Sequence, residues 1–414
     1  MKKYYPIASV IIGALLLAAG CQKAAEQEAD NPYHFKSEEA STVLTKAEGE
    51  MVVGSNSFGF NVAKQMVTMP EYQSGSFVFS PLSATVLLGM LEEGAEGETA
   101  ESISQVLGFG SNGREQINQF CRNMIVIADN SQDATVNLAN AIMLNQGNVL
   151  KDSYLKSSTE YYDAKCAVLD FSQSSSLDYI NNWASEKTHG LIPKLFDVLD
   201  PVAVAYLMNA LYFKSAWEDP FEKTEPYMDF HKEDGSTSMV EMMSQTSYFS
   251  YSESDALQKL TLPYKNGAYK MDILLPHEGH TIAETMGILG TDEWKALASS
   301  AQKSRVEVSI PSFSTAAHIE LLPILQSLGL KSFSGFSRIA DDVHFNGIFQ
   351  KAKIIVDKKG TEAAAITTTS REIAPAPGEE EPDPIIFRAD KPFIYLISEK
   401  TAGAILFIGT YMGR

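Results

Sequence analysis

Cysteine, histidine and basic residues are all scarce in this chain, and each shortage argues against a class of protein. Only three of the 414 residues are cysteine, too few for a fold held together by disulfides. Lysine and arginine number 33 against 52 aspartates and glutamates, and a net charge of −19 excludes a basic nucleic-acid binder. The seven histidines form no HExxH pattern, and GxSxG, GxGxxG and P-loop motifs are absent, which disfavours an enzyme.

The chain nevertheless contains enough apolar material for a large folded body. Hydrophobic residues make up 44% and aromatic residues 10%, which is ordinary for a globular protein and excludes wholesale disorder. Length by itself predicts two or three domains of about 150 residues each. However, no internal repeat or Pro/Gly/Ser-rich linker divides the chain before roughly its last fifty residues. We therefore expect one large domain over residues 49–414.

The first twenty residues have the features of an export signal. Two lysines precede an apolar stretch at 7–17, and small residues at 18–20 lead to Cys21. This end resembles a bacterial lipoprotein cleavage site, which implies lipidation of Cys21 and anchoring at the outer membrane or cell surface. The alternative is an ordinary secretory signal cut near Ala19. Residues 21–48 are rich in Glu, Ala, Gln and Ser, and we expect a flexible tether there.

The remaining cysteines and the histidines at 277 and 280 do not indicate a cofactor or metal site. Cys121 and Cys166 lack a CxxC spacing, so we expect structural thiols, and whether the two meet stays open. His277 and His280 follow an apolar run at a predicted turn, which disfavours a metal-binding pair. No cofactor is expected.

Apolar periodicity predicts a mixture of helices and strands. Helical spacing occurs around residues 60–67 and at 177–195, where Gly190 ends the pattern. No strict βαβ alternation is present, so the expected class is α+β with large antiparallel sheets. Apolar or alternating runs predict strands at 203–213, 270–275, 305–310, 352–356, 393–397 and 404–409.

One segment, residues 356–370, combines conflicting local preferences. Three consecutive alanines favour helix and three threonines after them favour strand, with no turn between the two runs. Such a conflict is expected where a segment adopts more than one conformation. With a period of two, one face carries only small uncharged residues that could enter a sheet over a core, namely Thr361, Ala363, Ala365, Thr367 and Thr369.

The residues after Thr369 are suited to remain outside a sheet. Arg371 is next on the same face, and an unpaired buried guanidinium would cost several kcal/mol, so insertion should end near it. Four prolines then bracket Glu379–Glu381, which favours an extended, solvated arm that proteases reach easily. On its own, this segment is equally well interpreted as a surface loop without a function.

Several stretches, in matching order and spacing, resemble the serpin family of serine protease inhibitors. Residues 360–365 are similar to the hinge of an inhibitory serpin's reactive loop, and residues 387–397 resemble the family's C-terminal signature. Residues 79–83 resemble the shutter region, and 209–221 the breach region. The implied fold has three β-sheets with a large central sheet, surrounding helices and an exposed reactive-centre loop. Further matching stretches lie at 94–107, 240–245, 262–264 and 401–409, so the resemblance covers essentially residues 51–414.

The resemblance implies a suicide-substrate inhibitor rather than an enzyme. A protease that cleaves the loop is carried away as the loop inserts into the central sheet, and the acyl-enzyme is trapped. Small hinge residues can pass between strands, and a glycine allows the pivot. We expect a monomer, and the alternative is a non-inhibitory surface binding protein with the same fold. The hinge residues are Gly360, Thr361, Glu362, Ala363, Ala364 and Ala365.

The resemblance also assigns a shutter and breach region, and two positions depart from the family pattern. Gln350 replaces the usual histidine, so the hydrogen bonds expected there with Ser80 and Asn209 would come from an amide. Lys358 replaces the usual acidic residue two positions before the hinge glycine. Both changes bear on how readily the central sheet opens. The region comprises Ser80, Ser83, Asn209, Gln350 and Trp217.

The attacked bond is expected in the loop after the hinge. Family spacing places it near Ala374–Pro375, but a proline on the leaving side makes a poor substrate for most serine proteases. We therefore predict cleavage at Ile373–Ala374 by an elastase-like or subtilisin-like protease. Arg371–Glu372 is the alternative and would indicate a trypsin-like protease. A bond within residues 379–381 and a cysteine protease as target are further alternatives.

Overall fold

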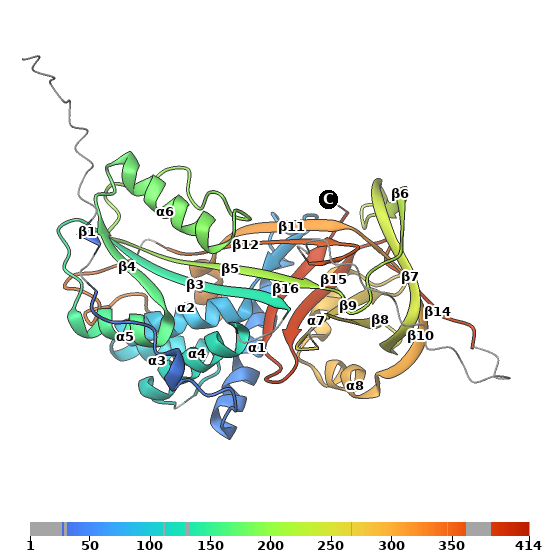
Figure 1. Cartoon of the computed structure of the whole chain (residues 1–414), viewed down its shortest axis with the longest axis horizontal. Coiled ribbons are helices and arrows are strands. Elements are labelled where there is room, and N and C mark those ends of the chain that lie inside the picture. Colours follow the sequence, from blue (N-terminus) through green and yellow to red (C-terminus); the bar gives the residue numbers. More distant parts are fainter. Residues whose placement is uncertain are drawn as a thin grey trace, which may run out of the picture.

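Within the residues that the structure describes, the central sheet has seven strands (Figure 1). The structure is a computed structural model and describes residues 27–28, 31–110, 112–129, 133–265, 267–345, 347–361 and 382–413. In order across the sheet, the strands are β1 (Gln27–Glu28), β4 (Ala164–Leu169), β3 (Ala134–Asn145), β5 (Ala205–Ala216), β13 (Gly360–Thr361), β12 (Ile348–Asp357) and β11 (Phe313–Glu320).

Burial along these strands follows from their sequences. In β12, buried and half-buried residues alternate at every position, the period expected of a strand with one face on a core. The first nine residues of β5 are all buried, because the main core covers one face of this strand and α6 (Ser174–Lys187) covers the other. The strands predicted at 203–213 and 352–356 are confirmed. β5 begins two residues later and ends three residues later than predicted, and β12 is longer than predicted at both ends.

A second sheet shares the main core with the central sheet. The long strand β7 (Thr237–Glu253) pairs with β10 over most of its length but with β8 only over residues 250–253, so it joins two parts of this sheet. By strand pairing, the described residues form two sheets, the central sheet and a second one in which β7 joins two parts. The other strands are β14 (Ile385–Arg388), β10 (Gln302–Pro311), β6 (Lys223–His231), β8 (Leu257–Pro263), β9 (Tyr269–Pro276), β15 (Phe393–Glu399), β16 (Ile405–Tyr411) and β2 (Phe77–Phe79).

The helices lie on both sides of the central sheet, with α6 on one face and most of the N-terminal helices on the other (Figure 1). Every residue of α2 (Pro81–Gly94) is buried. The serine before it caps this helix, because the Ser80 hydroxyl accepts the backbone N–H of Ser83 and a proline occupies the first helical position. The remaining helices are α1 (Lys46–Met66), α3 (Gly97–Val106), α4 (Arg114–Asp129), α5 (Asp152–Tyr162), α7 (Ile282–Ile288), α8 (Asp292–Ser300) and α9 (Leu321–Ser327).

The segment that precedes α1 is packed against the body. The expectation of a flexible tether over residues 21–48 is wrong for residues 31–48. The backbone N–H of Lys36 bonds the carbonyl of Glu160, and the carboxylate of Glu39 lies 2.8 Å from the buried guanidinium of Arg122. Thr45 then forms a capping box with Glu48 at the start of α1. Polar residues that suggested disorder are ordered here because they find fixed partners on α4 and α5.

Cys121 and Cys166 are both buried and both carry free thiols. Burial raises the pKa of each thiol, to about 11 for Cys166, which keeps it protonated and unreactive at neutral pH. The expectation of structural thiols is therefore confirmed. In the described part of the chain, no helix is both long enough and apolar enough to cross a membrane.

Candidate functional site

The hinge begins inside the central sheet, where β13 lies between β5 and β12. Gly360 pairs with Ala216 on β5 and with Asp357 on β12. Its φ of +152° disfavours any residue with a side chain, and a Cβ atom built there would lie 2.7 Å from the Cα of Ala216. Glycine is therefore required at this position both by the turn of the chain and by the close approach of β5.

Thr361 is the first hinge residue whose side chain points into the core. It is fully buried, and it pairs with Ser215 on β5 and Val356 on β12. Its hydroxyl lies 2.6 Å from the hydroxyl of Tyr264, which in turn stacks on Trp217 with ring centroids 4.6 Å apart. Burial raises the pKa of Tyr264, so this hydroxyl stays protonated and available to share a hydrogen bond.

Trp217, the breach residue named from the sequence, holds the turn that precedes the hinge. Its indole N–H donates to the carbonyl of Asp357 at 2.9 Å, and its backbone N–H donates to the carbonyl of Lys359 at 2.9 Å. The carboxylate of Asp357 accepts the backbone N–H groups of Lys359 and Gly360. Lys358 uses only its backbone carbonyl, which accepts from Phe221, while its side chain is exposed. The unusual charge at this position therefore lies at the surface.

The shutter residues meet below the hinge, where β5 and β12 pair directly over four residues, Leu207–Ala210 with Ile348–Lys351. The Gln350 amide accepts the backbone N–H of Ser80 at 2.8 Å and donates to the carbonyl of Ser80 at 3.0 Å. The hydrogen bonds expected from an amide are thus confirmed for Ser80. They are not formed with Asn209, although that residue lies directly opposite Gln350.

Asn209 instead bonds to two other buried side chains. It accepts the hydroxyl of Ser83 and donates to the side-chain oxygen of Asn140 at 2.8 Å. The Asn140 amide in turn donates to the backbone carbonyl of Tyr162 at the end of α5. The shutter thus connects β12, α2, β5, β3 and α5 through one buried polar network.

The sequence did not identify Tyr264, Ser215 or Asn140 as parts of this region. Tyr264 is in the Leu-Pro-Tyr stretch that resembles the family, but nothing local indicates a partner 97 residues away. The other proposed sites lie outside the described residues. These are Cys21, Glu362, Ala363, Ala364, Ala365, Arg371, Glu372, Ile373, Ala374 and Pro375.

A family model described as "Serpin (serine protease inhibitor)" matches residues 53–413. The chain belongs to the serpin family. An uncharacterised serpin-like protein of Thermococcus kodakarensis is 32% identical to this serpin over 382 residues, covering 89% of this chain and 87% of that protein. The crystal structure of a thermophilic serpin, tengpin, in its native state is similar with a TM-score of 0.79 and 25% identity, covering 89% of this chain and 95% of tengpin.

A second solved structure, human thyroxine-binding globulin, is similar to this serpin with a TM-score of 0.80 and 25% identity. The match covers 88% of this chain and 98% of the globulin. Together with the family match, these likenesses confirm the serpin fold with its large central sheet. Of the shutter and breach residues named from the sequence, Asn209 and Gln350 lie on β5 and β12, Trp217 directly follows β5, and Ser80 and Ser83 are at the start of α2.

Proposed function

We propose that this serpin inhibits serine endopeptidases through cleavage of its reactive loop, insertion of the loop into the central sheet and covalent trapping of the protease. The observation that carries this proposal is the position of Thr361, buried between β5 and β12 at the start of the loop. Family membership supports the same activity. The attacking nucleophile belongs to the protease, so the serpin contributes a substrate bond and a change of structure rather than a catalytic group.

The register of β13 indicates how a cleaved loop would continue into the sheet. Thr361 lies opposite Ser215 on β5 and Val356 on β12. Two residues further along this register, Ala363 would lie opposite Phe213 and Ile354. Both neighbours are large and buried, so a small residue is what the space between them admits. By the same register, the neighbours of each later residue on this face as far as Thr369 are also buried.

The length of the two flanking strands supports an end to insertion near Arg371. By the same register Thr369 would lie opposite Ile348, the first residue of β12, and Arg371 opposite Ala205, the first residue of β5. The guanidinium would then reach solvent at the end of the sheet rather than stay buried without a partner. The predicted bond at Ile373–Ala374 would lie just beyond the sheet, where a bound protease has room.

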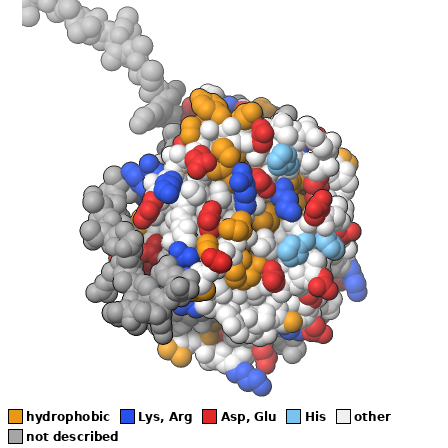
Figure 2. Space-filling view, turned by 90° about the vertical axis from the view of Figure 1, so that its right-hand side faces the viewer, with side chains coloured by type: hydrophobic (Ala, Val, Ile, Leu, Met, Phe, Trp, Pro, Cys, Tyr) orange, Lys and Arg blue, Asp and Glu red, His pale blue; other side chains and the backbone are white. Residues whose placement is uncertain are grey.

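The loop rejoins the fold at a face that carries both charge and exposed apolar groups. This end of the molecule faces the viewer in Figure 2, where hydrophobic side chains lie among acidic and basic ones. Tyr227, Met239 and Ile386 are each more than half exposed on β6, β7 and β14. A protease that binds the loop would approach this face, so the mixed surface supports recognition of a protein partner.

The experiment that tests the proposal is incubation with subtilisin-like, elastase-like and trypsin-like proteases in parallel. We expect an SDS-stable complex with a subtilisin-like or elastase-like protease, and a released C-terminal fragment that begins at Ala374. A fragment that begins at Glu372, formed with trypsin, would instead assign the bond to Arg371–Glu372. Cleavage of the loop by all three proteases without any covalent complex would contradict inhibition.

The second candidate function is ligand binding without protease inhibition. One similarity in structure supports this alternative. The name of thyroxine-binding globulin, which is similar in structure, describes a ligand carrier. A carrier would be cleaved without trapping the protease. The complex seen on the gel, rather than cleavage itself, therefore separates the two functions.

We also propose that Cys21 carries the lipid that holds the serpin at the outside of a bacterial envelope. Gln27 lies six residues after Cys21, a distance of at most about 20 Å along the chain, and pairs with Val168 at the edge of the central sheet. This edge and β14 lie at opposite ends of the long axis (Figure 1), so the loop end would face away from the membrane. Labelling with a radioactive fatty acid tests this: we expect the label in the natural chain and none in Cys21→Ser.

A further inference from the structure

The central sheet has an open edge beside a cavity. β4 pairs with β3 only over residues 140–145, so residues 134–139 of β3 have no described strand on that side. A cavity of about 820 Å³ lies there. Four consecutive β3 residues, Val136–Ala139, line it. Because successive strand residues point to opposite faces, this lining means that the cavity follows the edge of the strand.

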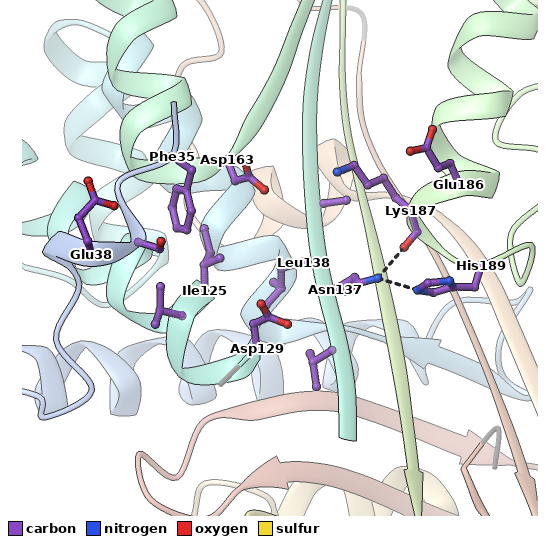
Figure 3. Close-up of a pocket in the computed structure, with 14 residues that line it drawn as sticks. Phe35, Glu38, Ile125, Asp129, Asn137, Leu138, Asp163, Glu186, Lys187 and His189 are labelled. Atoms are coloured by element: carbon purple, nitrogen blue, oxygen red, sulfur yellow. Dashed lines mark hydrogen bonds between the residues drawn. The ribbon is translucent and has the colours of Figure 1, made fainter. Parts of the chain in front are cut away.

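On one side of β3 the wall of the cavity combines apolar and acidic side chains, and on the other side it is polar (Figure 3). Phe35 and Ile125 contribute apolar surface from the N-terminal segment and α4. Lys187 and His189 lie across the strand at the end of α6, where the Asn137 amide donates to the Lys187 carbonyl and contacts the His189 ring nitrogen. Side chains from both faces of β3 therefore line this space.

The charge around the cavity favours a cationic occupant. Asp129 is the last residue of α4, and Asp163 caps the end of α5. Helix C-termini carry partial negative charge and normally attract basic residues, yet neither helix has one in its last turn. The Asp129, Asp163 and Glu186 carboxylates form no hydrogen bond or ion pair with another described residue. Two carboxylates at two helix C-termini repel each other and the helix dipoles, and a cation between them would relieve this repulsion.

One cation is present nearby but does not neutralise this charge. Lys187 lies close enough to lower the pKa of Asp163, while burial of that carboxyl raises it by more. Lys187 makes no ion pair within 4 Å to a described carboxylate. The lining therefore carries the four acidic groups of Glu38, Asp129, Asp163 and Glu186 against one lysine.

We propose that the open edge of β3 over residues 134–139 is a docking site for an extended basic peptide segment of a partner protein. The strand edge supplies backbone hydrogen-bonding groups, the apolar wall receives one face of the peptide, and the carboxylates bind lysine or arginine side chains on it. Strand addition of this kind combines main-chain affinity with side-chain selection. A small organic cation would use the charge but not the open edge.

Titration of the full chain with synthetic hexapeptides tests the proposal, because six residues span about 20 Å and match the open edge. The probe peptide alternates arginine with valine. A second copy is N-methylated at alternate residues, so that it cannot form backbone hydrogen bonds with the edge of β3. We expect the first peptide to bind at least tenfold more tightly than the second and than a glutamate–valine peptide. Hydrogen exchange should slow at residues 134–139.

Two variants of the lining should change the affinity for the peptide in opposite directions, which misfolding cannot do. Asp163→Asn should weaken binding at least tenfold, and asparagine tolerates the left-handed backbone of this residue (φ 48°). Lys187→Met should tighten binding severalfold, because it removes a repelling charge. Asp178→Asn, an exposed change on the same helix α6, should leave the affinity unchanged. Equal binding of the N-methylated peptide, or exchange protection along β12 in place of β3, would overturn the proposal.

Discussion

At the scale of single residues, Gly360 and Thr361 have separate tasks in the hinge. Gly360 lets the chain turn back from β12 and pass close to the backbone of β5, where a side chain has no room. Thr361 then enters the core as a small residue whose hydroxyl is satisfied by Tyr264. A buried hydroxyl without a partner costs about 1–3 kcal/mol, so the tyrosine makes a threonine acceptable at this depth.

The change Thr361→Arg should convert the inhibitor into a substrate. The inward position is fully buried, and an unpaired guanidinium there costs several kcal/mol, so the hinge cannot enter the sheet quickly enough to trap a protease. We expect loop cleavage to continue and SDS-stable complexes to disappear. Thr237→Arg, an exposed change on β7, is the matched control and should keep complex formation. Complexes of normal yield with the hinge variant would refute the insertion argument.

Asp272 should stabilise the fold in a pH-dependent manner. Burial raises the pKa of its carboxyl, but the ammonium groups of Lys259 and Lys270, at 2.8 and 2.9 Å, lower it by more. Because the folded-state pKa lies below the unfolded value of about 3.9, this stabilisation is complete above that pH and is lost as pH falls through the folded pKa.

Replacement of the Asp272 carboxylate by an amide tests this predicted pH dependence of stability. Asp272→Asn leaves the buried Lys259 without its partner, and we expect a loss of about 3–5 kcal/mol at neutral pH. Urea unfolding midpoints of the two proteins should differ at pH 7 and converge below about pH 4. Asp229→Asn, an exposed change on β6, should alter neither midpoint. A gap that stays constant down to the lowest pH at which both proteins fold would show that Asp272 is not the titrating group.

At the scale of secondary-structure elements, the contact between β5 and β12 decides how far the loop can enter. β13 separates these strands at the top, and they pair directly only over Leu207–Ala210 and Ile348–Lys351. Gln350 fixes this paired part to the start of α2 through two hydrogen bonds to Ser80. The amide therefore stabilises the closed sheet, in place of the histidine that is usual in the family.

The change Gln350→Ala should make the sheet open more easily. It leaves the buried N–H of Ser80 without a partner, at about 1–3 kcal/mol, and removes a restraint on β12. The Ser80 carbonyl keeps the backbone N–H of Ala84. We expect inhibitory activity to decay several times faster on warming, as intact loops insert spontaneously. Residual activity after timed incubation measures this decay, with Lys353→Ala on the outer face of β12 as control. An unchanged decay rate would exclude Gln350 as a restraint.

At the scale of the whole molecule, insertion of the loop adds a full strand to the middle of the central sheet. Among the described residues, Gly360 and Thr361 at the start of this strand are already paired with β5 and β12. If the loop inserts as we propose, a kinetic barrier holds the native chain in addition to its equilibrium stability. The two flanking strands are long enough to pair with the loop down to residue 369.

Cleavage of the loop should raise thermal stability strongly. The cut removes the restraint that holds the loop outside, so new hydrogen bonds form on both sides of the inserted strand. Calorimetry before and after limited proteolysis between residues 362 and 381 measures the change. Cleaved Thr361→Arg serves as the control, because its hinge cannot enter and its melting temperature should stay low. An unchanged melting curve of the cleaved natural chain would favour a non-inhibitory serpin.

Much of the site could be predicted from the sequence because it is encoded in short stretches. The period of two in residues 361–369 identifies a face of small residues, and Thr361 lies in the core as that pattern predicts. The helix at 174–187 and the strands around it follow from local periodicity. The order of residues 31–48 did not follow, because their polar side chains are ordered only by contacts with Arg122, Asn123 and Glu160.

The sequence by itself determined the family, through short motifs that resemble it, and the positions of the main strands, because apolar spacing acts locally along the chain. Only the tertiary structure decided which residues from distant parts of the sequence contact the hinge and the shutter. Tyr264 reaches Thr361, and Asn140 reaches Asn209, because sheet register brings together residues far apart in sequence. The open edge of β3 arises in the same way. A strand is left without a neighbour when β4 is shorter, and no local pattern in β3 records the length of its partner.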